Sequence, residues 1–132
     1  MRTAIGVLAL AMMAAASGGE RFAGTWQATM KGKVFLVLKV KAAEKISGTL
    51  NAGHIEINDE GELKEAGPVE DHEAPIFFAQ VEGDKLRFDF QDDDGGVITF
   101  ELKVTGEGAG ELRIVDKEHP NWKGFTVKKV AS

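Results

Sequence analysis

The sequence predicts an all-β protein whose antiparallel strands follow one another as an up-and-down meander and close into a barrel of about 8–10 strands. Three observations lead to this prediction. Apolar and polar residues alternate in short runs between residues 22 and 130, which is the period of a half-buried strand. Turn-forming dipeptides such as Asp94-Gly95 separate these runs, and no long stretch has the helical period. A two-sheet sandwich is the alternative, because the same alternation fits both architectures.

The first two strands are expected at residues 22–30 and 34–41, joined by a turn at residues 31–33. Alternation places Trp26 on the core face of the first strand. The second strand has one fully apolar face and carries Phe35 on the other. Two strands alone cannot bury this much apolar surface or satisfy their edges, so the later segments must supply their partners.

Seven further strands are expected, at residues 46–51, 54–58, 75–81, 86–90, 97–105, 111–115 and 125–130. In the first strand after residue 74, alternation turns Phe77 toward the core and leaves Ile76 and Phe78 outside. An acidic segment at residues 59–73 shows little periodicity. We expect it to form a surface loop or flap, because unstructured segments of this length are uncommon unless they are functional or mobile.

The N-terminal residues 1–16 have the pattern of a secretory signal peptide. Arg2 precedes an apolar run that ends in small residues, and cleavage is expected after Ala16. The run is too short to cross a bilayer, so no stable membrane insertion is expected after cleavage. We therefore expect an exported protein, periplasmic or extracellular, with a flexible N-terminus at residues 17–21 and a single barrel domain at residues 22–132.

Composition excludes some classes of protein. The chain has 16 basic and 21 acidic side chains and a formal net charge of −5. Nucleic acid is therefore not expected as a partner, because binding phosphates requires a basic face. The chain has no cysteine, so the hydrophobic core must hold the fold without disulfides. No cofactor is implied by any motif.

The opening Phe22-x-Gly24-Thr25-Trp26 resembles the Gly-x-Trp signature of calycin barrels, which include lipocalins, fatty-acid-binding proteins and avidins. The later pattern is similar to small exported bacterial lipocalin-like proteins of unknown function, in its Ser-Gly-Thr strand, its Gly-Asp-Lys turn followed by an aromatic residue, and a late tryptophan: Ser47-Gly48-Thr49, Gly83-Asp84-Lys85, Phe88 and Trp122. The resemblance implies a ligand-binding barrel. It also implies a basic residue packed across Trp26, for which Lys128 and Lys129 are the candidates.

The chain departs from two of these families. No helical pair follows the first strand, as it would in a fatty-acid-binding protein, and the chain has no tyrosine with which to line an avidin site. We expect non-catalytic binding of a small apolar ligand at the open end of the barrel, through residues Phe35, Phe77, Phe78, Phe88 and Trp122. Trp26 either floors that pocket or plugs the bottom of the barrel, and the plug is favoured because an eight-stranded barrel is barely wide enough for its own side chains.

Two further hypotheses remain open. A protein-interaction module would use an outward apolar patch of Phe35, Val37, Ile76 and Phe78. A metal-dependent hydrolase would use the acidic loop around Glu70-Asp71-His72-Glu73. We expect no metal site, because no second histidine lies at ligand spacing and the three consecutive aspartates from Asp92 point apart. We expect no enzyme, because no cysteine or Gly-x-Ser-x-Gly motif supplies an activated nucleophile.

Overall fold

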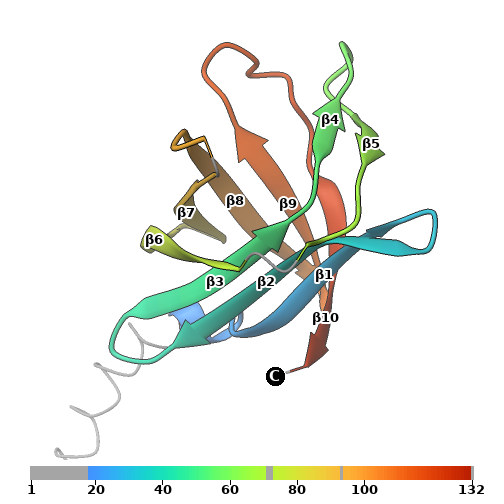
Figure 1. Cartoon of the computed structure of the whole chain (residues 1–132). Coiled ribbons are helices and arrows are strands. Elements are labelled where there is room, and N and C mark those ends of the chain that lie inside the picture. The colour runs from blue at the N-terminus through green and yellow to red at the C-terminus, as the bar shows by residue number, and fades with distance from the viewer. Residues whose placement is uncertain (1–17, 71–72, 93, 132) are drawn as a thin grey trace, which may run out of the picture.

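The computed structural model describes residues 18–70, 73–92 and 94–131, so the expected signal peptide at residues 1–16 lies outside the described part. The described residues form ten strands: β1 (Gly24–Met30), β2 (Lys33–Ala42), β3 (Ile46–Ala52), β4 (Ile55–Ile57), β5 (Leu63–Ala66), β6 (Ala74–Glu82), β7 (Lys85–Gln91), β8 (Val97–Gly106), β9 (Ala109–Val115) and β10 (Phe125–Ala131). Eight of them close into an antiparallel barrel in the order β1-β10-β9-β8-β7-β6-β3-β2 (Figure 1). The predicted fold class is confirmed, and the barrel replaces the sandwich alternative.

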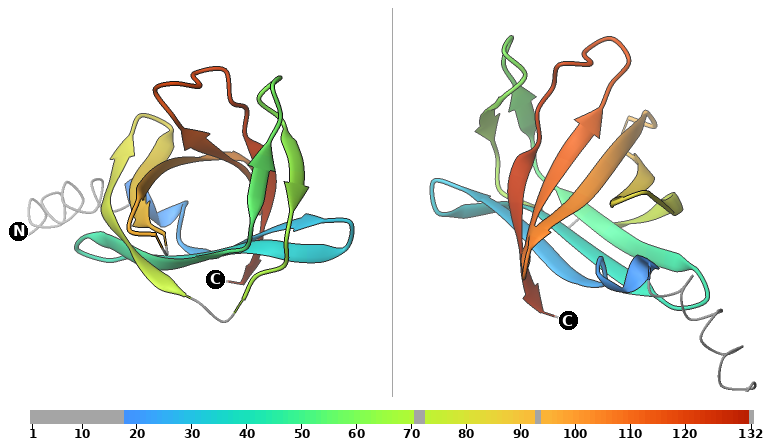
Figure 2. Two further views of the ribbon diagram at one scale, coloured as in Figure 1. Left: turned by 45° about the horizontal axis from the view of Figure 1, so that its top comes forward. Right: turned by 180° about the vertical axis from the view of Figure 1, so that it is seen from behind.

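The remaining two strands, β4 and β5, pair with each other as a hairpin outside the barrel. The hairpin is inserted between β3 and β6, which close the barrel by pairing with each other. This pairing is short, because it joins Thr49 with Pro75 and Leu50 with Ala74. Figure 2 shows the hairpin rising beside the loop between β9 and β10. The segment 59–73, predicted as a loop or flap, therefore contains the regular strand β5.

The N-terminal segment closes the opposite end of the barrel (Figure 2). Residues 18–20, within the segment expected to be flexible, form a helical turn. The Phe22 amide donates to the Gly19 carbonyl at 3.0 Å, and the Arg21 guanidinium donates to the Gly83 carbonyl at 3.0 Å. Within the described ranges, no helix has the length and apolar character needed to span a membrane.

Trp26 fills the interior above this turn. Its side chain is fully buried, and its indole N–H donates to the Phe22 carbonyl at 2.9 Å. The one polar group of the side chain therefore keeps a hydrogen-bond partner in the core. The pairing of β1 with β10 sets Lys129 opposite Trp26, and the Lys129 ammonium lies 5.1 Å from the ring centroid. Of the two lysines that the resemblance left open, Lys129 is the one that packs across the tryptophan.

Two irregular strands change which residues face the core. An extra residue in β2 turns Phe35 inward, where its ring packs 5.3 Å from that of Phe125. In β6, Ile76 pairs with Phe90 and is buried, so its predicted outward position is wrong. A bulge then follows Phe77, because the irregular ladder adds a residue to β6.

The bulge leaves Phe78 on the surface. Phe78 has φ of 54° and is 79% exposed, while Phe77 pairs with Asp89 on the outer face. The predicted inward position of Phe77 is therefore wrong. The apolar patch proposed for a protein partner is also not formed as predicted, because Phe35 and Ile76 are in the core.

We expect Trp26→Ala to lower the free energy of unfolding by about 3–5 kcal/mol, because the large cavity left at the barrel bottom cannot refill. Urea denaturation followed by circular dichroism measures this change. Thr29→Ala on the exposed outer face of the same strand serves as the control and should alter stability by about 0.5 kcal/mol or less. Similar effects of the two substitutions would contradict the placement of Trp26.

A candidate ligand pocket at the open end

A pocket of about 830 Å³ lies at the end of the barrel opposite Trp26. Its floor consists of inward side chains from the upper ends of three neighbouring strands: Phe90 of β7, Ile98 and Phe100 of β8, and Ile114 of β9. These residues share one side because paired residues on antiparallel strands point to the same face. The Phe100 ring stacks on that of Phe88 at 5.4 Å, so Phe100 separates the pocket from the filled interior below.

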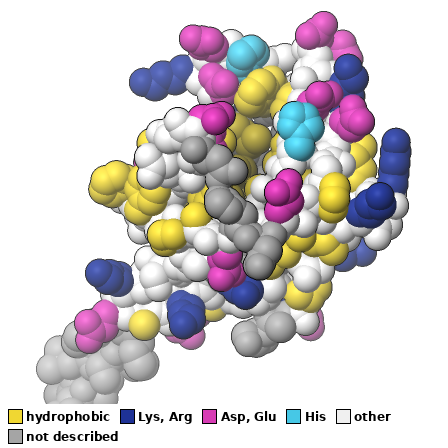
Figure 3. Space-filling model, in the orientation of Figure 1, with side chains coloured by type: hydrophobic (Ala, Val, Ile, Leu, Met, Phe, Trp, Pro, Cys, Tyr) yellow, Lys and Arg dark blue, Asp and Glu magenta, His cyan; other side chains and the backbone are white. Residues whose placement is uncertain are grey.

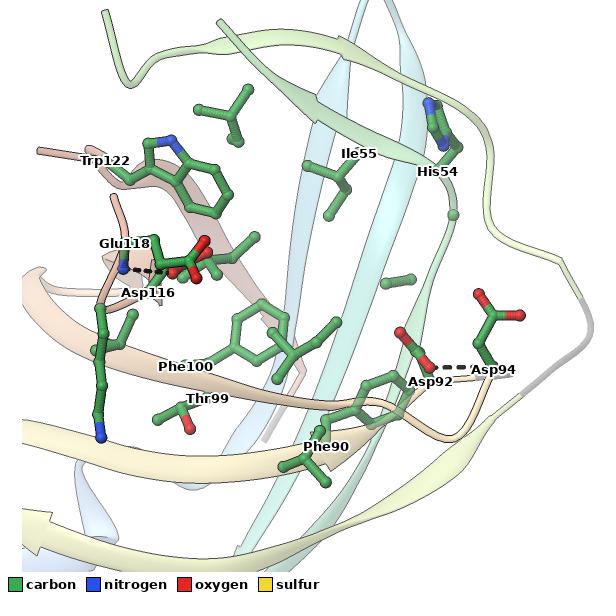
Figure 4. A pocket seen from close by; sticks show the side chains of 18 of the residues that line it. His54, Ile55, Phe90, Asp92, Asp94, Thr99, Phe100, Asp116, Glu118 and Trp122 are labelled. Atoms are coloured by element: carbon green, nitrogen blue, oxygen red, sulfur yellow. Dashed lines mark hydrogen bonds between the residues drawn. The ribbon is translucent and has the colours of Figure 1, made fainter. Parts of the chain in front are cut away.

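The hairpin and the β9–β10 loop extend the walls of the pocket beyond the barrel. Ile55 and Ile57 of β4 line one wall, with Ala52 from the end of β3 beneath them. Trp122 of the β9–β10 loop lines the pocket beside them (Figure 4). Apolar and aromatic side chains therefore form the floor and the inner walls of the pocket, whereas charged and polar side chains make up much of the rest of its lining.

Close contacts hold the hairpin against the loop. The Lys123 amide donates to the Gly61 carbonyl at 2.7 Å, and the Lys123 ammonium lies 3.6 Å from a carboxylate oxygen of Glu62. Gly61 has φ of 84°, and a Cβ there would lie 2.9 Å from the Cα of Trp122. Glycine at this position therefore allows both the hairpin turn and the close approach that joins the two walls.

The loop also fixes the orientation of Trp122. The His119 ring stacks on the indole at 4.6 Å, and its Nδ1 lies 3.2 Å from a carboxylate oxygen of Asp116. The Glu118 amide donates to the other oxygen of Asp116 at 2.8 Å. This backbone hydrogen bond, followed by the contact with His119, lowers the pKa of Asp116.

Residues 67–70 and Glu73 contact the outside of β2 and β3. The Val69 amide donates to the Val34 carbonyl at 3.1 Å, and Asn51 donates through its side chain to the Glu70 carbonyl. The carboxylate of Glu73 contacts the Lys39 ammonium at 3.1 Å and accepts from the Thr49 hydroxyl at 2.9 Å. These two partners, Lys39 first, lower the pKa of Glu73. Glu70 also lines the pocket, so residues 67–70 reach from the outside of the sheet to the pocket mouth.

Charged side chains surround the mouth. Figure 3 shows hydrophobic side chains inside a hollow near the top of the molecule, with acidic and histidine side chains around it. Asp92 accepts hydrogen bonds from the amides of Asp94 and Gly96 at 3.0 and 2.9 Å, so one of its oxygens shapes the β7–β8 turn. Among the described residues, no group of three or more acidic or histidine side chains is arranged to hold a metal ion. His72 and Asp71 of the hydrolase hypothesis lie outside the described part.

The residues predicted to bind a ligand occupy different places. Trp122 lines the pocket, whereas Trp26, Phe35 and Phe88 are buried in the core. Phe77 and Phe78 belong to the bulged part of β6, and neither lines the pocket. Sequence reasoning missed the floor residues, which are Phe90, Ile98, Phe100 and Ile114. The signal that identifies them is their position at the upper ends of the strands, together with the small Ala52 opposite.

The chain matches no known family model, and no curated protein and no solved structure shows significant similarity to it. The class of protein is therefore defined here by the fold and the pocket alone. That class is a closed eight-stranded antiparallel barrel, consistent with a lipocalin-like barrel, with a pocket at one end.

We expect the Asp116 carboxyl group to titrate below its ordinary value of 3.8, because it accepts from the Glu118 amide and contacts His119. Since the pKa is lower in the folded state, these contacts stabilise the fold above pH 3.8 and are lost as the pH falls through the folded pKa. A ¹³C NMR titration of the side-chain carboxyl carbons measures the pKa directly. Titration of Asp116 at or above 3.8 would contradict the loop geometry.

Proposed function

We propose that this chain is an exported, non-catalytic binding protein that holds a small apolar ligand in the pocket at the open end of its barrel. The observation that carries the proposal is the pocket of about 830 Å³ with an apolar floor. A pocket of this volume suits a ligand of the size of a drug or a medium-chain lipid. Removing the apolar surface of such a ligand from water supplies the driving force, roughly 25 cal/mol per Å² of apolar area buried.

Preorganisation supports the same proposal. Binding affinity is lost when a site must be ordered on ligand binding. Here Trp122 is already stacked on His119, and the hairpin is already hydrogen-bonded to the loop through Gly61 and Lys123. Contacts within the chain therefore hold the walls of the pocket in place.

The absence of catalysis is part of the proposal. His54, which lines the pocket, and His119 of the β9–β10 loop face Glu56 and Asp116 in exposed pairs at 3.2 Å. No serine or cysteine that could act as a nucleophile is among the described residues that line the pocket. Export is proposed from the signal-peptide pattern of residues 1–16 and from the resemblance to small exported bacterial lipocalin-like proteins.

A second candidate, a protein-interaction module, is favoured by one observation. Phe78 is 79% exposed in a left-handed backbone conformation, next to the ring of Phe77 at 5.5 Å. Bulky side chains in this conformation are strained, and strain of this kind gathers at functional sites. The experiment below separates this outer surface from the pocket.

The proposal predicts that the purified chain binds the neutral apolar dye Nile red with one site per chain, measured by the increase in dye fluorescence. Ala52→Phe should weaken this binding about tenfold or more, because the new ring points into the pocket and removes volume from it. Trp122→Ala should also weaken binding, by removing one wall. Circular dichroism checks that both variants remain folded.

Phe78→Ser is the matched control, because it removes an exposed aromatic ring that lies outside the pocket. It should leave the dye affinity unchanged. If Phe78→Ser abolished dye binding while Ala52→Phe did not, the dye would be on the outer surface of β6 and the interaction module would become the better proposal.

A further inference from the structure

We infer that the ligand of this pocket is an amphiphile with a cationic end group, such as an alkylammonium compound, rather than a fatty acid or a neutral lipid. The inference rests on the proposed function and adds to it the charge of the ligand. The apolar floor of the pocket receives the alkyl chain, and the charged side chains at its mouth determine which head group can remain there. Charge complementarity of this kind governs specificity more than total affinity.

Acidic side chains greatly outnumber basic side chains among the residues that line the pocket. Among those that the structure describes, five carry carboxylates and one carries an ammonium: Glu70, Asp92, Asp94, Asp116 and Glu118 against Lys117. A carboxylate head group at this mouth would meet like charges, whereas an ammonium group would be attracted to them.

The carboxylates come from both sides of the mouth. In Figure 4, Asp116 and Glu118 of the β9–β10 loop lie on one side of the pocket, and Asp92 and Asp94 of the β7–β8 turn lie on the other. The apolar side chains of Phe90, Phe100 and Ile55 lie between these two groups. A ligand whose alkyl chain fills the apolar part would therefore place its head group near acidic side chains on either side.

Two of the carboxylates have no structural task within the described part of the chain. Asp92 and Asp116 each accept backbone hydrogen bonds that shape their own loops. The side chains of Asp94 and Glu118 make no hydrogen bond or ion pair with the described residues. Within the described part of the chain neither side chain holds its loop in place, so both can be neutralised without breaking either loop.

The one basic lining residue does not reverse this balance. Lys117 is exposed in the same loop as Asp116 and Glu118, so two carboxylates adjoin it in sequence. An ammonium on a flexible side chain can swing into water, because lysine has a long stem and a strongly hydrated head. The rim as a whole remains acidic.

The test is isothermal titration calorimetry with three probes of equal chain length, namely decylammonium, 1-decanol and decanoate, at neutral pH and low salt. We expect decylammonium to bind about tenfold more tightly than decanol, and decanoate to bind more weakly than decanol. The advantage of decylammonium should shrink as sodium chloride is added, since salt screens exposed charges.

The outcomes separate this inference from the proposed function. Equal affinities for the three probes would overturn the cationic ligand while leaving an apolar binding pocket. Tighter binding of decanoate would overturn it as well. Binding of none of the three would refute the pocket itself, and with it both the proposed function and the inference.

A pair of double variants then locates the effect. Asp94→Asn with Glu118→Gln should reduce the preference for decylammonium over decanol to about threefold or less, with the affinity for decanol unchanged. Glu44→Gln with Glu107→Gln removes the same charge from two exposed turns at the other end of the barrel and should keep the full preference. Equal losses in the two double variants would mean that net charge alone attracts the probe, and would overturn the role of the rim.

Discussion

The width of an eight-stranded barrel constrains every other feature of this molecule. A barrel of this size is just wide enough to be filled by side chains or to hold one small ligand. Here the lower half is filled, with Trp26 at its bottom and the stacked rings of Phe88 and Phe100 above. The pocket accordingly lies above Phe100, at the end of the barrel away from Trp26.

The hairpin β4–β5 enlarges that remaining space. It leaves the barrel between β3 and β6, joins the β9–β10 loop through Gly61 and Lys123, and raises the pocket walls beyond the rim of the barrel. Because the hairpin is inserted between them, β3 and β6 pair with each other over a short length. The apolar depth of the pocket and its acidic mouth thus have separate origins, since the depth comes from barrel strands and the charge from the loops that connect them.

Alternation was sufficient to predict the barrel and the inward position of Trp26, because the period of two is a local property of an extended chain. It failed at Phe35 and at Ile76 and Phe77, because one extra residue in a strand reverses every face on one side of the irregularity. The location of the pocket was not predictable for a different reason. It depends on where Phe100 lies relative to Trp26 and on contacts between segments as distant as Gly61 and Lys123, which no local pattern encodes.

The central claim is that the barrel is filled below Phe100 and open above it. The most direct test is methyl NMR of the chain during titration with a neutral alcohol such as 1-decanol. We predict that the methyl signals of Ile55, Ile98 and Ile114 shift together, while those of Leu38 and Leu102 in the filled half stay in place. Shifts at Leu38 and Leu102, or shifts confined to the outer face of β6, would contradict this account.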